Sequence, residues 1–143
     1  MVLTSEDREL AFSPAYELVG MMKSKKLSPV ELMEAILRRI EELNPKLNVY
    51  LTLSEEEAIQ GAKQAEAAIS KGTDLGPLHG LPAAIKDLYN VKGMRTTSGS
   101  LVYNDFIPSE DGILAERLKK AGAVIVGKTN TPEFGMANST ENR

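Results

Sequence analysis

Two lysines follow short apolar runs, and a lysine in such a position can take part in acid–base chemistry. Lys86 follows Ala83-Ala84-Ile85, and Lys128 follows Val124-Ile125-Val126 after one glycine. Both runs are typical of buried strands, so each lysine is expected near the carboxyl end of a strand. Burial disfavours the charged ammonium, which allows such a lysine to act as a base near neutral pH. The alternative, which the residues alone favour, is that Lys86 pairs with Asp87 or a helix terminus and only closes its strand.

The second lysine also completes a match to the phosphate-loop pattern, from Gly122 to Thr129. That pattern binds phosphate only where its four middle residues form a loop between a strand and a helix. Here they are Ala, Val, Ile and Val, which favour a strand, and Thr131-Pro132 prevents a regular helix directly after the lysine. A nucleotide-binding domain is therefore kept only as a third hypothesis, which a failure of ATP or GTP to raise the melting temperature rejects.

Composition excludes several other classes of site. The 143 residues contain no cysteine and one histidine, so disulfides, thiolate catalysis and Cys- or His-rich metal sites are not expected, and we predict no cofactor. His79 lies in a turn rich in glycine and proline, where a hydrogen-bonded surface or hinge histidine is expected. Near Met1 the chain has Thr4-Ser5-Glu6-Asp7 in place of a basic region followed by an apolar one, and no apolar stretch approaches the roughly 18 residues of a membrane span. The net charge is -3, and acidic and basic residues are interspersed along the chain. We expect a cytoplasmic protein with no membrane or direct nucleic-acid partner.

The elements that position the lysines can be predicted from caps, periodicity and breakers. Residues 1–72 form a helical front with one short strand, and residues 73–143 form an α/β part of the same single, partial domain. In the front we expect a helix opened by Ser13-Pro14, a helix from the capping box at Ser28 to a stop at Asn44-Pro45, a strand over Leu47–Leu53, and a helix from a capping box at Ser54 to Lys71-Gly72. In the second part, the strand before Lys86, a helix over Asp111–Ala121 and the strand before Lys128 predict a right-handed parallel crossover. Ligands of such sheets gather at the carboxyl ends of the strands.

Several segments, in the order in which they occur, resemble the amino-terminal part of the amidase signature family. These segments are Gly76-Pro77-Leu78-His79-Gly80-Leu81-Pro82-Ala83-Ala84-Ile85-Lys86-Asp87, Thr96-Thr97-Ser98-Gly99-Ser100, Asp111-Gly112 leading to Leu118, Ala121 to Asn130, and Glu133-Phe134. The resemblance implies an α/β fold with helices packed on a mixed, partly parallel sheet that is incomplete in this chain. It also implies a hydrolase of carboxamide C–N bonds with a Ser/cis-Ser/Lys triad, a small-molecule amide substrate and no cofactor.

On that resemblance Lys86 corresponds to the catalytic lysine, whereas Lys128 matches a position outside the triad and is expected to be structural. The loop that contains Met136 lines the acyl pocket in the family, which makes Met136 a candidate substrate-binding residue. The alternative is a methionine that packs beneath a turn. The family places both serines in a glycine-rich stretch after the Lys-Thr-Asn segment, and residues 1–143 contain no such stretch. The chain alone is therefore expected to be inactive.

Two explanations of the missing serines remain open. The chain is either the first portion of a longer enzyme or a noncatalytic interaction remnant, and a stop within a loop favours the first. Within the family, residues 133–142 are similar to the glutamyl-tRNA amidotransferase A subunit, which is the second candidate. An incomplete sheet also predicts exposed strand edges and apolar surface, and so association through a homodimer or aggregation.

Overall fold

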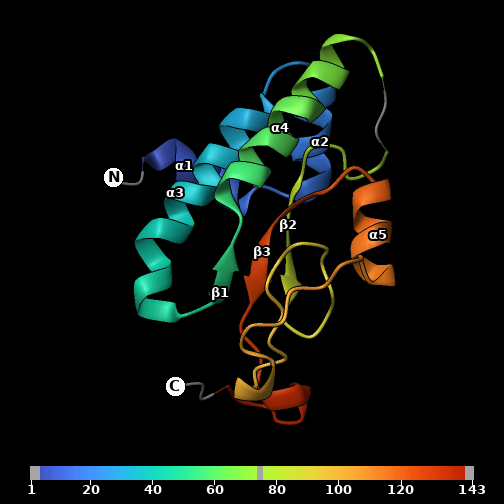
Figure 1. The fold of residues 1–143 in the computed structure, drawn as a ribbon. Helices are drawn as coiled ribbons and strands as arrows, with labels where there is room; N and C mark the ends of the chain where they lie inside the picture. Colours follow the sequence, from blue (N-terminus) through green and yellow to red (C-terminus); the bar gives the residue numbers. More distant parts are fainter. Residues whose placement is uncertain (1–3, 74–75, 141–143) are drawn as a thin grey trace.

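The computed structural model describes residues 4–73 and 76–140 (Figure 1). In chain order, the longer elements are α1 (Ser5–Phe12), α2 (Ala15–Lys23), α3 (Pro29–Leu47), β1 (Tyr50–Leu53), α4 (Glu55–Ser70), β2 (Pro82–Lys86), α5 (Ile113–Lys120) and β3 (Val124–Thr129). Two single-turn 3₁₀ helices, η1 (Leu101–Tyr103) and η2 (Glu133–Gly135), complete the described part of the chain.

The helices of the front agree with the sequence in type and differ at their ends. Helix α1 was not predicted, although Thr4 and Asp7 form a reciprocal capping box at its start. The predicted capping box at Ser28 is confirmed, since its hydroxyl accepts hydrogen bonds from the second and third residues of α3. Helix α2, which was expected to open at Ser13-Pro14, has Pro14 as its N-cap residue.

The predicted stop of α3 at Asn44-Pro45 is wrong, because the helix continues to Leu47. A proline in the last turn removes few hydrogen bonds, and Asn48 ends the helix in the left-handed conformation. The Asn44 side chain forms hydrogen bonds with both the amide and the carbonyl of Tyr50. Strand β1 begins at Tyr50, later than the predicted start at Leu47. The capping box predicted at Ser54 is also wrong, since the Ser54 side chain makes no capping hydrogen bond to α4.

The three strands form one mixed sheet in the order β1-β3-β2. Strand β2 runs parallel to β3, as predicted, and β1 runs antiparallel to it (Figure 1). Gly127 of β3 has no room for a side chain, because a Cβ there would stand 2.3 Å from the carbonyl oxygen of Thr52 in β1. The segment that matches the phosphate-loop pattern is therefore strand β3 and its preceding turn, as the β-branched residues indicated.

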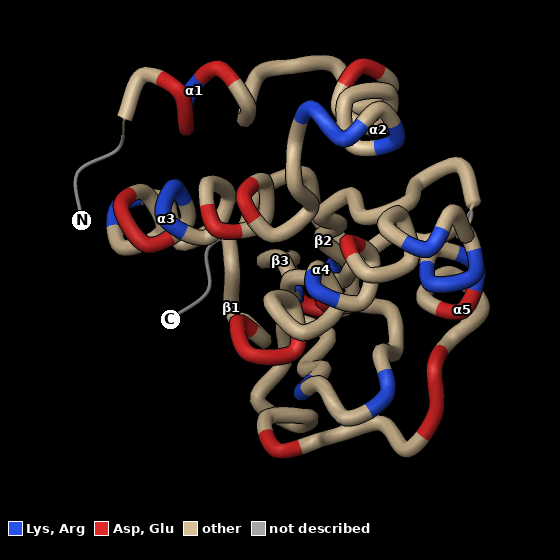
Figure 2. The backbone as a smooth tube through the Cα atoms, turned by 90° about the horizontal axis from the view of Figure 1, so that it is seen from above, with Lys and Arg blue, Asp and Glu red and all other residues tan. Residues whose placement is uncertain are grey.

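Helices cover both faces of the sheet. Helices α3 and α4 pack with Val126 in one apolar cluster, and α5 packs with Ile85 and Ile125 on the other face. Lys, Arg, Asp and Glu residues are interspersed along α1, α3 and α5 (Figure 2). None of the helices over the described ranges is long and apolar enough to cross a membrane.

Candidate active site

The candidate site lies at the carboxyl ends of β2 and β3, where the loops of the second part of the chain gather (Figure 1). The loop after β3 returns to the end of β2, because the amide of Phe134 donates to the carbonyl of Ser98 at 2.8 Å. Gly135 lies against Leu88, so closely that a Cβ at Gly135 would stand 2.6 Å from the Leu88 side chain. The structure thus brings the end of β2, the loop after it and η2 together.

Lys86 is the last residue of β2, where it was expected, but its side chain is exposed. The prediction that the fold withdraws water from this amine is wrong for the described residues, because Lys86 and Ala84 share the exposed face of β2, whereas Ile85 and Asp87 on the other face are buried. The alternative pairing of Lys86 with Asp87 is also wrong. Over residues 4–73 and 76–140, the Lys86 amine has no hydrogen-bond or ion-pair partner.

The buried lysine of the sheet is Lys128, and it is paired with the residue next to Lys86. Lys128 and Asp87 are both fully buried, and the Lys128 Nζ lies 2.9 Å from Asp87 Oδ1. The same amine donates to Thr96 Oγ1 at 2.6 Å. Asp87 Oδ2 accepts hydrogen bonds from the Thr97 amide at 2.9 Å and the Thr97 hydroxyl at 2.5 Å. Asp87, Thr96, Thr97 and Lys128 together form the buried Asp–Lys network.

The electrostatics of the network follow from its burial. Burial lowers the pKa of Lys128 below the usual lysine value, and the hydrogen bond and charge of Asp87 oppose this shift. A fully buried amine that already holds two partners is not accessible to a substrate. The expectation that Lys128 is structural agrees with this geometry.

The buried Asp–Lys network was not predicted from the sequence, because it depends on the register between β2 and β3. Ile85 lies opposite Lys128 in the parallel pairing, so both side chains point to the same face of the sheet. Side chains alternate along a strand, which places Asp87 on the face of Lys128 and Lys86 on the opposite face. The pairing of β2 with β3 is irregular between Ala83 and Ala84, so the register that brings Asp87 and Lys128 together does not follow from the two apolar runs alone.

The other candidate residues have distinct environments. His79 was expected at the surface or a hinge, but its side chain is only 1% exposed, and its Nε2 lies 3.0 Å from the carbonyl of Ala65 in α4. Met136 directly follows η2 and is 85% exposed. Ser100 is buried and its hydroxyl donates to Glu133 at 2.7 Å.

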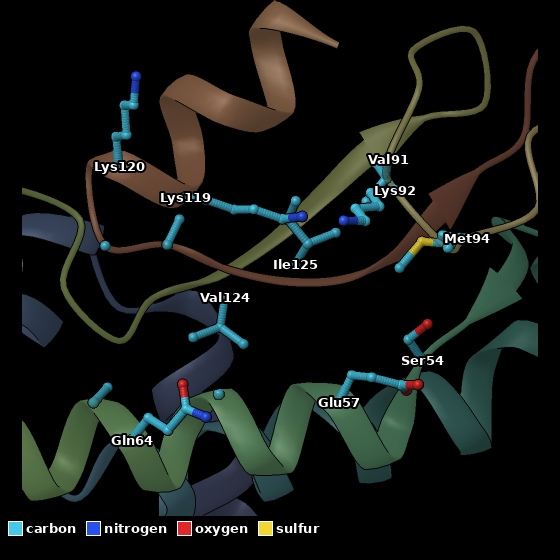
Figure 3. A pocket seen from close by; sticks show the side chains of 15 residues that line it. Ser54, Glu57, Gln64, Val91, Lys92, Met94, Lys119, Lys120, Val124 and Ile125 are labelled. Atoms are coloured by element: carbon cyan, nitrogen blue, oxygen red, sulfur yellow. The ribbon is translucent and has the colours of Figure 1, made fainter. Parts of the chain in front are cut away.

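A hollow of about 540 Å³ lies between α4, α5 and β3, away from the candidate site (Figure 3). Its charged lining residues include Glu57, Lys92, Lys119 and Lys120. Lys119 is paired with Asp111 and Lys120 with Glu116, so two of these amines are already engaged. Lys86 and Lys128 are not among its lining residues. In the described part of the chain, no cluster of three His, Asp or Glu side chains could hold a metal ion.

Comparison with known proteins shows which family the chain resembles. The Amidase family model matches residues 31–143, which is most of the chain and includes both lysines. The chain belongs to the amidase family. It is 47% identical over 126 residues to the A subunit of the glutamyl-tRNA(Gln) amidotransferase of Geobacter metallireducens, a match that covers 88% of this chain and 26% of that protein. The corresponding subunit of Carboxydothermus hydrogenoformans is 42% identical over 134 residues, covering 94% of this chain and 28% of that protein.

Solved structures of amidases share the fold of this family member. A fatty acid amide hydrolase matches with a TM-score of 0.92 and 28% identity, covering 99% of this chain and 25% of that chain. The peptide amidase of Stenotrophomonas maltophilia matches with a TM-score of 0.83 and 34% identity, covering 91% of this chain and 27% of that chain. The chain therefore spans about a quarter of the length of the relatives it matches. Membership of the amidase signature family and the partial α/β fold, both predicted from the sequence, are confirmed.

Proposed function

We propose that this chain is the amino-terminal part of an amidase that cleaves carboxamide C–N bonds, with Lys86 as the base of a Ser/cis-Ser/Lys triad. Both serines would come from polypeptide outside these residues. The single observation that carries the proposal is the position of Lys86 at the carboxyl end of a parallel strand in an amidase-family fold, with its amine unpaired among the described residues. An amine held in place but not yet paired can accept hydroxyl partners.

In the proposed reaction, neutral Lys86 takes a proton from the bridging serine, and that serine takes the proton of the nucleophilic serine. The nucleophile attacks the amide carbonyl, the C–N bond breaks, and the amine leaves with a proton passed back through the relay. Water then hydrolyses the acyl-enzyme. A neutral Lys86 requires removal of water from its surroundings. Since Lys86 is exposed among the described residues, the covering polypeptide must supply this desolvation.

The same covering polypeptide would enclose the substrate. It would also bury the apolar surface that this chain exposes next to the site. Met136 is a candidate substrate contact, and the neighbouring Gly135, which lies against Leu88 just beyond the end of β2, supports this role. Leu101, Val102 and Phe134 are also exposed around η1 and η2. Without a cover, this surface favours association of the chain as a homodimer or aggregate.

The test is expression of the complete reading frame that encodes these residues, followed by an assay of ammonia or amine release. Short aliphatic amides, aryl amides and peptide amides serve as substrates. We expect Lys86→Ala to reduce kcat by about 10⁴-fold or more, because the members of a proton relay act as a unit. Lys63→Ala is the matched control, since Lys63 is an exposed lysine of α4.

Each other outcome contradicts part of the proposal. Near-normal turnover of Lys86→Ala would reject Lys86 as the base. A reading frame that supplies no glycine- and serine-rich stretch, with no turnover of any amide, would favour the noncatalytic interaction remnant.

A second candidate function is that of an amidotransferase A subunit, favoured by identities of 41–47% to such subunits. In that case amide hydrolysis would be coupled to transamidation on a charged tRNA. The assay separates the two functions, because a stand-alone amidase turns over its amide alone. An amidotransferase subunit would instead deliver ammonia to glutamyl-tRNA(Gln) only when its partner subunits are added.

A further inference from the structure

The buried Asp–Lys network fixes the backbone on both sides of the Asp87 peptide. The Asp87 amide donates to the carbonyl of Thr129 in β3 at 2.9 Å, and the Asp87 carbonyl accepts from the amide of Ser98 at 2.9 Å. Its carboxylate holds Lys128 and Thr97 at the same time. Asp87 therefore joins the end of β2, the end of β3 and the loop after β2 at one point.

Lys86 is the residue that this arrangement positions most directly. Its backbone is held by pairing with Thr129 and, one residue later, by Asp87. Its side chain is on the opposite face of the sheet from the ion pair, so the network acts on the peptide chain and not on the amine. An exposed lysine side chain with no partner of its own among the described residues depends on the backbone for its location.

The hydroxyls of Thr96 and Thr97 connect the network by hydrogen bonds to the backbone of the loop after β2. Thr97 Oγ1, which donates to Asp87, also accepts from the Gly99 amide at 3.1 Å. Thr96 Oγ1 accepts from Lys128 and donates to the Met94 carbonyl at 3.1 Å. Each charged atom of the pair thus has a partner, as a buried ion pair requires. A buried pair of this kind contributes little to stability compared with apolar side chains of similar volume. Stability alone therefore does not account for its geometry.

We propose that Asp87 and Lys128, with Thr97, are positioning residues that hold the Lys86 amine at the place where it meets its hydroxyl partner. This inference rests on the proposed function, because it assigns the network a purpose only if Lys86 is the base. The network also keeps its two charges paired with each other, which leaves the Lys86 amine free of a carboxylate partner. The residues act through the backbone and touch neither substrate nor reacting atoms.

The experiment uses the complete enzyme and two kinds of variant. Asp87→Asn combined with Lys128→Met removes both charges and keeps similar shapes. Thr97→Val removes one hydroxyl bond to Asp87, and Thr97→Ser is its matched control because it keeps that hydroxyl. Active sites are counted with a fluorophosphonate, which phosphonylates the proposed serine nucleophile, so that kcat refers to folded enzyme only.

We expect the double variant to lose about 100-fold in kcat with little change in KM, because small misplacements of a catalytic group have effects of this size. Thr97→Val should lose about 10-fold, whereas Thr97→Ser should retain wild-type kcat. A purely structural role would lower the thermal midpoint and the number of active sites but not kcat per site. If the double variant does not fold, the comparison of the two Thr97 variants decides the question.

The outcomes separate this inference from the proposed function. If Lys86→Ala is inactive while the double variant and Thr97→Val both keep kcat within about threefold of wild type, the positioning role is overturned and Lys86 stays the base. If Lys86→Ala remains active, the proposed function fails and the positioning role fails with it.

Discussion

The two lysines at neighbouring strand ends differ in almost every physical respect. Lys86 ends the edge strand β2, points to the exposed face and has no partner among the described residues. Lys128 lies in the central strand β3, is fully buried and holds Asp87 and Thr96. Residue type and strand position are nearly the same, so the difference comes from the sheet order and from which face each side chain meets. Lys128 therefore has the environment of a structural ion pair, whereas Lys86 is exposed and unpaired among the described residues.

The largest expected effect is that of Lys128→Met on the stability of the chain. It leaves Asp87 as a buried charge without its counter-ion, and such changes destabilise proteins by about 3–5 kcal/mol. Lys86→Met is the matched control, with an expected change within about 0.5 kcal/mol, because Lys86 is exposed and unpaired in the described part of the chain. Urea unfolding followed by circular dichroism measures both variants. Equal effects of the two substitutions would contradict the distinction drawn between the lysines.

A second, smaller effect is expected when both charges of the pair are removed. Asp87→Asn combined with Lys128→Met should be more stable than Lys128→Met alone by about 2 kcal/mol, since no unpaired buried charge remains. The measurement is a double-mutant cycle by urea unfolding, with Asp87→Asn as the second single variant. Additive effects of the two substitutions would show that Asp87 and Lys128 are not coupled.

These contrasts also show how far the sequence could lead. The strand before Lys86, the strand before Lys128 and their parallel pairing follow from apolar runs and connecting helices, and the structure confirms them. Burial of Lys86 was predicted from the apolar run before it, and the prediction failed because Lys86 shares the exposed face of β2 with Ala84, whereas Ile85 and Asp87 lie on the buried face. The predicted end of α3 was wrong for a local reason, because a proline is tolerated in the last turn, which Asn48 ends. The catalytic role of Lys86, the substrate contact at Met136 and the division near residue 72 stay predictions.

An ion pair in the helical front allows a pH test of how a charged partner stabilises a buried carboxylate. Arg38 lies 2.6 Å from Asp7, and its hydrogen bond, together with that from the Thr4 amide, holds the pKa of Asp7 well below the usual aspartate value. A carboxyl whose pKa is lower in the folded chain stabilises the fold above its unfolded pKa of about 4. That contribution is lost as the pH falls further.

We therefore expect Arg38→Met to lower the thermal midpoint at pH 6 and to have a progressively smaller effect below about pH 4. Thermal unfolding between pH 2 and pH 7 measures the difference from wild type. Lys63→Met, on the exposed face of α4, is the control and should show no such dependence. A difference that grows as the pH falls would contradict the assignment of the lowered pKa to Asp7.

The smallest effect is expected at the exposed pair of α5, which has the same charges as the buried pair and nearly the same separation. Lys120 Nζ lies 2.5 Å from Glu116 Oε1, but both side chains are more than half exposed, so water and salt screen the attraction. Lys120→Met should change the thermal midpoint by about 2 °C or less, and 1 M NaCl should remove most of that change. Lys128→Met is the comparison, and its effect should persist in salt because its partner is fully buried. A large, salt-insensitive effect at Lys120 would show that distance, and not burial, sets the importance of an ion pair in this chain.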